Sequence, residues 1–218
     1  MPGQITLETG FGRELRALAA NPKYKVFVEV GTWDGQGSTK CICDALCERS
    51  DGAGLYTFEA NRDWWRVASS YWADKAVTPL RVIYGRLAER MMSDKEVLEH
   101  PLYAKIKEHY ALYFTQDERD FAAAPLARMR ACDVAILDGG EFSGYWDWKA
   151  VEPLSPRVVC LDDTRVMKNS EVLAEMLSKG WKLVWESDER NGAAILEAPT
   201  SPQSSPSEAT ESPSSQSL

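Results

Sequence analysis

The most constraining feature of this sequence is the segment Lys25–Thr39, which reads KVFVEVGTWDGQGST. Its apolar residues at 26–30 predict a short buried strand. The strand runs directly into a glycine-rich turn and then into a helix start at Ser38 and Thr39. Glycine permits positive φ and a close approach of backbone N–H groups to a ligand, and a helix N-terminus favours an anionic group. A strand, a glycine turn and a helix start together indicate a nucleotide-type cofactor site.

The spacing of the glycines indicates which cofactor this site would bind. Gly31, Gly35 and Gly37 form the pattern G-x-x-x-G-x-G, which differs from the G-x-G-x-x-G of the dinucleotide-binding fingerprint. An acidic residue, Glu29, also stands inside the strand, two positions before the first glycine. These two features favour S-adenosylmethionine (SAM) over NAD.

Composition limits the class of protein and its partners. A hydrophobic content of 44% and eight tryptophans are enough to form the core of one domain. The formal net charge is −8, whereas proteins that bind nucleic acid are typically basic, so nucleic acid is not expected as a partner.

The five cysteines contain no C-x-x-C pair, which predicts neither a disulfide framework nor a zinc site. Without a leader pattern or an apolar run of about 20 residues, we expect a soluble, cytoplasmic protein that does not enter the membrane.

Strands and helices alternate along most of the chain. Apolar runs predict strands at 26–30, 54–58, 80–84, 133–137 and 158–161, and helical patterns lie at 5–21, 38–48, 62–71, 145–151 and 170–179. This alternation predicts parallel crossovers in a Rossmann-like, doubly wound α/β sheet. The last two strands, 181–187 and 193–197, are joined by a turn with Asn191-Gly192, a strong hairpin signal. We therefore expect a mostly parallel, seven-stranded sheet with an antiparallel C-terminal hairpin.

The chain is expected to form one domain over residues 1–198. Residues 86–131 are longer than a crossover needs, and they predict a helical insert that serves either as a lid or substrate wall or as plain structural helices. Residues 199–218 are rich in Ser and Pro and contain no aromatic residue. Such a segment buries too little apolar surface to order itself, so we expect a disordered tail.

Two further positions extend the predicted cofactor site. Glu59 ends the second strand, where an acidic side chain can accept hydrogen bonds from both ribose hydroxyls of a nucleoside. The alternative is that Glu59 caps the following helix. Gly85-Arg86 follows the third strand, where the chain would pass the adenine ring.

Carboxylates follow the next two strands. VAILDGGEF presents Asp138 and Glu141, and VVCLDDT presents Asp162 and Asp163. The carboxyl ends of parallel strands share one edge of the sheet, so these side chains are expected to lie close together. Ionised carboxylates in a small volume need a cation, and a hard divalent ion such as Mg²⁺ meets that need. Asp162 and Asp163 face opposite sides of a regular strand, so both reach one ion only if the chain turns there. The alternative is that one of the two caps a helix or binds backbone amides.

Together, these motifs resemble the class I SAM-dependent methyltransferases, and in particular the small metal-dependent O-methyltransferases, which include sugar methyltransferases. The resemblance covers about residues 24–197. It is carried by the cofactor loop VEVGTWDGQGSTKC, by ILDGGEFSGYWDW and VVCLDDT after the fourth and fifth strands, and by SDERNGAAIL in the terminal hairpin.

The resemblance implies a role for each candidate residue. The cofactor would be held by Glu29, Gly31, Thr32, Trp33, Asp34, Gly35, Gly37, Ser38, Glu59, Ala60, Gly85 and Arg86. A divalent metal, Mg²⁺ or Mn²⁺, would be held by Asp138, Asp162 and Asp163. Many relatives carry a histidine just after the fourth-strand aspartate, whereas this chain has Gly139-Gly140-Glu141. The general base is therefore open, with Glu141 the first candidate and Asp138 the second. The implied acceptor is a hydroxyl of a sugar, or else a phenolic or other small-molecule hydroxyl.

Two other functions remain open on the sequence. Tyr145 and Lys149 form the Y-x-x-x-K pair that short-chain dehydrogenases use for proton transfer. A methyltransferase-like fold can also serve as a non-catalytic binding module. For Arg190, in the closing hairpin, there are two interpretations: a solvated turn charge, which is preferred, and a side chain that reaches the acceptor site.

Overall fold

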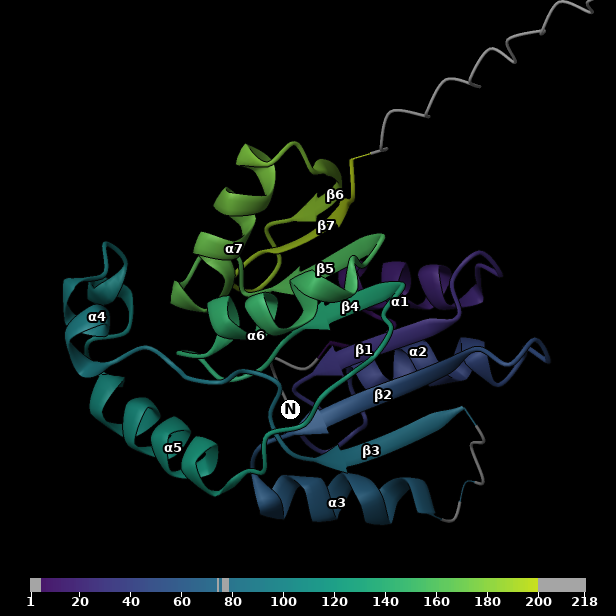
Figure 1. Cartoon of the computed structure of the whole chain (residues 1–218), viewed down its shortest axis with the longest axis horizontal. Helices are drawn as coiled ribbons and strands as arrows, with labels where there is room; N and C mark the ends of the chain where they lie inside the picture. The colour runs from purple at the N-terminus through teal and green to yellow at the C-terminus, as the bar shows by residue number, and fades with distance from the viewer. Residues whose placement is uncertain (1–4, 74, 76–78, 200–218) are drawn as a thin grey trace, which may run out of the picture.

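The computed structural model describes residues 5–73, 75 and 79–199, and its centre is one seven-stranded sheet (Figure 1). The strands are β1 (Val26–Val30), β2 (Gly54–Glu59), β3 (Leu80–Tyr84), β4 (Val134–Leu137), β5 (Val158–Asp162), β6 (Lys182–Ser187) and β7 (Ala193–Glu197). Their order is β3-β2-β1-β4-β5-β7-β6. Neighbours from β3 to β5 pair in parallel, and β7 pairs antiparallel with both β5 and β6. The predicted parallel sheet and antiparallel hairpin are confirmed, while the tail predicted at 199–218 lies outside the described residues from position 200 onward.

Helices cover both faces of the sheet, because its central strands are apolar on both sides. In β4 and β5 every residue is buried. One core contains Phe27 and Ile136 and packs against α1 (Gly10–Ala20), α2 (Ser38–Leu46) and α3 (Arg62–Ala73). The opposite core contains Val28 and Leu137 and packs against α6 (Gly144–Val151) and α7 (Met167–Ser178). Adjacent strand residues therefore serve opposite cores, as expected for a doubly wound sheet.

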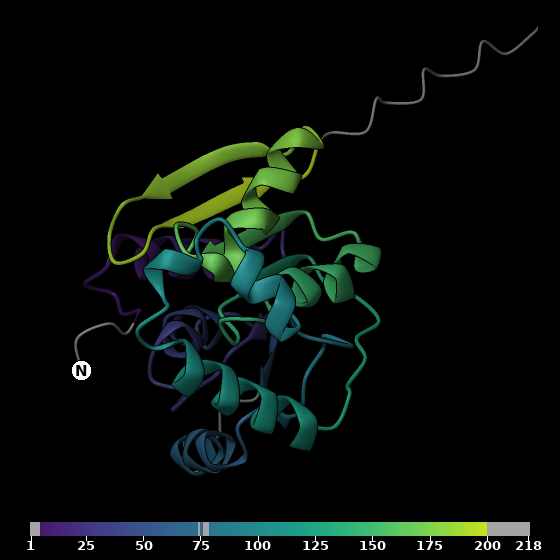
Figure 2. The ribbon, with the colours of Figure 1, turned by 90° about the vertical axis from the view of Figure 1, so that its left-hand side faces the viewer.

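The long segment between β3 and β4 crosses the carboxyl end of the strands. It contains α4 (Asp94–Glu99), a 3₁₀ turn (Tyr103–Lys105) and α5 (Tyr110–Ala123). Figures 1 and 2 show α4 and α5 in front of the edge toward which the parallel strands point. A cluster of Val97, Ile106, Phe142 and Met167 packs this insert onto the loops after β4 and β5. No helix in the described part of the chain is long and apolar enough to cross a membrane.

Gly31 joins the first βα corner to the loop after β4. Its φ is +95°, and a Cβ atom at this position would lie 2.0 Å from the carbonyl oxygen of Asp138. Any side chain here would force the two loops apart, in addition to the cost of the left-handed backbone. The absence of a Cβ atom therefore lets the glycine turn and the carboxylate loop share one site.

Replacement of Gly31 tests this close approach. We expect Gly31→Ala to lower the free energy of unfolding by at least about 2 kcal/mol more than Gly52→Ala. Gly52 also has positive φ (+77°), but a Cβ atom added there would have no neighbour within 4 Å, so it controls for the backbone conformation alone. Urea denaturation of the two variants measures the difference, and equal losses would contradict the steric argument.

Candidate functional site

A cavity of about 370 Å³ lies at the carboxyl ends of the parallel strands. Its wall is formed by the glycine turn, by the residues after β2, β3, β4 and β5, by the insert and by the hairpin turn. The volume is within the range of small-molecule and cofactor sites. The edge predicted from the sequence therefore contains a cavity of suitable size.

Most residues predicted to bind the cofactor line this cavity. They are Gly31, Thr32, Trp33, Gly37, Ser38, Glu59, Ala60, Gly85 and Arg86. Glu29 lies instead beneath α2, fully buried, where its Oε2 accepts a 2.6 Å hydrogen bond from Thr39 Oγ1. Burial raises the pKa of Glu29, and neighbouring hydroxyls partly offset that effect. Asp34 and Gly35 stabilise the turn from outside the cavity: Asp34 accepts from the backbone N–H of Gln36, and the Gly35 carbonyl accepts from Trp72 Nε1.

Glu59 connects the first two βα corners. Its Oε2 accepts a 2.7 Å hydrogen bond from the Trp33 backbone N–H, and its Oε1 accepts a 2.8 Å bond from the Asn61 N–H. Asn61, not Glu59, caps α3, because its Oδ1 accepts from the backbone N–H groups of Asp63 and Trp64. Burial raises the pKa of Glu59 to about 7. Each carboxylate oxygen can accept a further bond, so a donor in the cavity can still bind here.

The insert forms the far wall of the cavity. From α5 it contributes Asp117, Asp120 and Phe121. Asp120 Oδ2 accepts a 2.8 Å hydrogen bond from Asn61 Nδ2, and the Arg86 guanidinium lies 4.1 Å from the centre of the Phe121 ring. The insert therefore forms part of the cavity wall, and its service as a lid or substrate wall stays a prediction.

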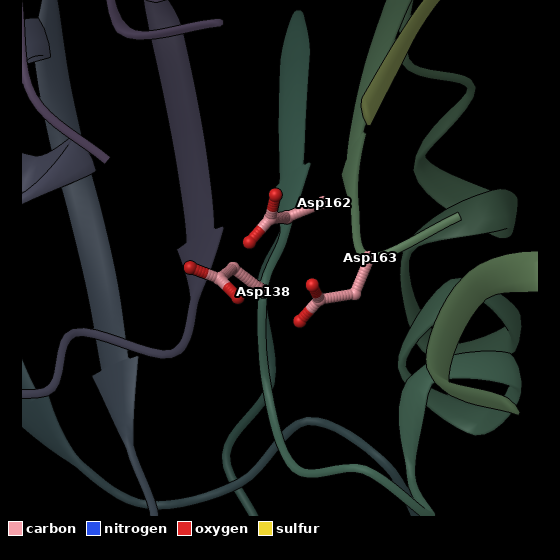
Figure 3. A group of neighbouring side chains, drawn as sticks. All are labelled: Asp138, Asp162 and Asp163. Carbon is pink, nitrogen blue, oxygen red and sulfur yellow. The ribbon is translucent and has the colours of Figure 1, made fainter. Parts of the chain in front are cut away.

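Three aspartates lie together where β4 and β5 end (Figure 3). Asp138, Asp162 and Asp163 each place a carboxylate oxygen within 4.8 Å of the others. Asp162 is the last residue of β5, and Asp163 adopts a left-handed conformation with φ 55°. This is the turn that the sequence argument required, because without it the two side chains would face opposite sides of the sheet.

Two cations of the chain itself offset most of the negative charge of this cluster. Lys168 Nζ lies 2.6 Å from Asp138 Oδ1 and 3.0 Å from Asp163 Oδ2. Arg190 Nη1 lies 3.1 Å from Asp162 Oδ2. Although burial acts in the opposite direction, the Lys168 ammonium lowers the pKa of Asp163, and Asp138 and Asp163 raise the pKa of Lys168. Burial and the charge of Asp138 raise the pKa of Asp162.

The interpretation of Arg190 as a solvated turn charge is therefore incomplete, because the residue is exposed but its guanidinium pairs with Asp162 and lines the cavity. The hairpin turn packs against the β5–α7 loop, where the backbone N–H of Thr164 donates to the Gly192 carbonyl. From the same turn, Asn191 Nδ2 donates a 3.1 Å hydrogen bond to Asp163 Oδ1. The sequence placed this turn at an edge of the sheet but did not show which loop it contacts.

Lys168 gives no functional signal in the sequence, because it is a single lysine in a helix. Its neighbour Asn169 is fully buried and donates to the backbone carbonyls of Leu137 and Asp162, which attaches α7 to the ends of β4 and β5. A Cβ atom at Gly144 would lie 1.9 Å from the Lys168 carbonyl oxygen, so this glycine lets α6 approach α7. These two contacts place Lys168 in the cluster.

Glu141, the first candidate base, does not line the cavity. Its carboxylate lies near the backbone N–H of Lys168, and burial raises its pKa to about 7. Its Oε1 has no hydrogen-bond partner among the described residues. Asp138, the second candidate, lines the cavity.

The tyrosine–lysine pair of the dehydrogenase alternative lies elsewhere. Tyr145 donates a 2.8 Å hydrogen bond to Glu175 on α7, and Lys149 pairs with Glu175 and Glu152. Neither Tyr145 nor Lys149 lines the cavity. Proton transfer by this pair to a substrate at the glycine turn is therefore not supported.

Glu59 predicts a pH dependence of stability. Its pKa is about 7 in the folded protein against an ordinary value of 4.5, so the folded state holds a proton that the unfolded state releases. Stability from this group is thus present at low pH and lost as pH rises from about 4.5 to about 7. The unfolding free energy of the wild type, relative to Glu59→Gln, should fall by up to about 1.4 kcal/mol per pH unit in this window. Urea denaturation across this pH range measures the unfolding free energies, and Glu186→Gln, at an exposed position, is the control. A difference between the wild type and Glu59→Gln that does not change with pH would contradict the prediction.

Comparison with known proteins gives structural matches only. No protein-family model matches the sequence, and no curated protein is a recognisable relative. A methyltransferase from Geobacter sulfurreducens is 13% identical, with a TM-score of 0.56 over 88% of this chain and 80% of that one. An O-methyltransferase from Bacillus cereus in complex with S-adenosylhomocysteine (SAH) is 12% identical, with a TM-score of 0.53 over 91% of this chain and 84% of that one. The O-methyltransferase TomG from Streptomyces achromogenes, in complex with SAM, is 15% identical, with a TM-score of 0.53 over 90% of this chain and 82% of that one. The chain therefore has the fold of the SAM-dependent O-methyltransferases.

Proposed function

We propose that this protein is a SAM-dependent O-methyltransferase that methylates a hydroxyl group of a small molecule, with a sugar as the first choice. The observation that carries the proposal is the shared cavity. The glycine turn, the acidic end of β2 and Asp138 all line it, in a fold shared with structures that hold SAM or SAH.

The residues of the cavity suit SAM. The N-terminus of α2 at Ser38 offers a favourable environment for the carboxylate of its methionine part. Glu59 can accept hydrogen bonds from the ribose hydroxyls, and Gly85-Arg86 would border the adenine. Trp33 and Trp64, whose rings meet edge to face at 5.3 Å, add an aromatic wall. When bound, SAM supplies a methyl group on a positively charged sulfur, which an oxygen nucleophile can attack.

A proton must leave the acceptor hydroxyl during the transfer. We assign its removal to Asp138, because this carboxylate lines the cavity, whereas Glu141 does not. Asp138 would take the proton as the acceptor oxygen is methylated, while bound SAM would supply the methyl group and keep the electron pair of the broken C–S bond on its sulfur. The proton then passes from Asp138 to water, so charge and atoms balance.

The divalent ion predicted from the sequence stays a prediction and takes no part in this mechanism. The spacing of the three aspartates suits an ion, but the Lys168 ammonium already bridges two of them and Arg190 lies beside the third. The chain thus supplies two cations toward the need that motivated the prediction, against three carboxylates. As they are arranged, these residues do not fit a divalent ion.

The charges around the cavity favour an acceptor without phosphate groups. Among the described lining residues, the carboxylates of Glu59, Asp117, Asp120, Asp138, Asp147 and Asp163 outnumber the cations of Arg86, Lys168 and Arg190. An excess of carboxylates repels a phosphorylated ligand, while carboxylate oxygens accept hydrogen bonds from sugar hydroxyls. A free sugar or glycoside therefore suits the cavity better than a nucleotide sugar.

We further propose that the protein works in the cytoplasm. Cys41, Cys43, Cys47, Cys132 and Cys160 are all free thiols. Free cysteines are typical of a reducing compartment.

Cofactor binding and methyl transfer test the proposed function separately. Calorimetry should show saturable binding of SAH, and labelled SAM should methylate members of a panel of free sugars, glycosides and catechols. Asp138→Asn should keep SAH binding and lose at least about 100-fold in transfer rate, the usual contribution of a general base. Glu186→Gln, on exposed β6, serves as the control. Absence of SAH binding would reject the proposal, and SAH binding without transfer to any acceptor would favour a non-catalytic module.

A further inference from the structure

We propose that Lys168 is a built-in cation of this site, which takes the place that the sequence pattern assigns to a divalent metal ion. The catalytic meaning of this built-in cation rests on the proposed function. Its place between the aspartates is supported independently, by the positions of the charges.

The ammonium group of Lys168 makes the contacts expected of a bridging cation. It joins Asp138, which follows β4, to Asp163, which follows β5, at 2.6 and 3.0 Å. Its side chain is 9% exposed, so solvent screens these ion pairs little. One group thus connects the two carboxylate-bearing loops across the edge of the sheet.

The position of Lys168 is unfavourable for the helix that carries it. It is the second residue of α7, where the positive end of the helix dipole disfavours a cation. Burial of an ammonium also carries a desolvation cost, which only close opposite charges offset. A lysine here therefore depends on the aspartates, and it makes no separate contribution to helix stability.

Charge balance argues against a metal ion in addition to these residues. Asp138, Asp162 and Asp163 face Lys168 and Arg190, which leaves a formal charge of −1. A divalent ion would bring this cluster to +1 and would lie beside the Lys168 ammonium. Two cations side by side repel each other strongly where solvent screens their charges little. The ion and the ammonium therefore exclude each other.

Removal of the ammonium should open the site to a metal. We expect no saturable Mn²⁺ binding by the wild type at this cluster. Lys168→Met should bind Mn²⁺ saturably, with a dissociation constant at least about tenfold below the highest Mn²⁺ concentration at which the wild type shows no binding, because the carboxylates of the variant lose their bridging cation. Lys168→Arg keeps the charge and should behave like the wild type. Lys149→Met is the matched control, since Lys149 also pairs with two carboxylates but lies outside the cavity.

Mn²⁺ titration of the full chain, read by the electron paramagnetic resonance signal of free Mn²⁺, tests whether Lys168 excludes a metal ion from the cluster. Wild-type binding that Asp163→Asn abolishes would overturn the proposal, and so would a folded Lys168→Met that binds no Mn²⁺. If Lys168→Met is unfolded, refolding with Mn²⁺ replaces the titration: recovery of near-UV circular dichroism supports the proposal, and no recovery overturns it. SAH calorimetry on the same wild-type sample reports separately on the proposed function, because it does not depend on the Mn²⁺ result.

Discussion

The site depends on the balance of buried charges where β4 and β5 end. The sheet topology places Asp138, Asp162 and Asp163 within one small volume, where their mutual repulsion must be offset. Lys168 and Arg190 supply the opposite charges from α7 and from the hairpin turn. The carboxylate loops, the helix and the hairpin are thus connected by ion pairs as well as by apolar packing.

Two groups of loops lie side by side at the carboxyl edge of the sheet. The first and second βα corners are joined by Glu59, whose carboxylate accepts hydrogen bonds from the backbone of both corners. The β4 and β5 ends present the acidic cluster, and Gly31 brings the loop after β4 against the first corner. The cofactor binding and the proton transfer that we propose would therefore take place at adjacent loops, and the insert closes the opposite side with Asp117 and Asp120.

The predictable part of this protein follows from local patterns. Buried strands of β-branched residues, the glycine turn and the Asn191-Gly192 hairpin signal each depend on near neighbours in the sequence, so the parallel sheet and its hairpin could be inferred. The divalent ion expected beside the aspartates stays a prediction. The ion pairs that Lys168 and Arg190 make with these aspartates were not predictable, because both residues lie in elements whose contacts depend on how the chain packs.

The sequence by itself determined the α/β fold, the glycine turn of the first βα corner and the collection of carboxylates at one edge, since strand periodicity and parallel connections require them. Only the tertiary structure decided which side chains face the cavity. In the folded chain, Glu141 lies against the start of α7, Lys168 lies between Asp138 and Asp163, and Arg190 lies beside Asp162. The physical reason is that side-chain direction and charge pairing depend on the docking of α7, the insert and the hairpin, which no local pattern specifies.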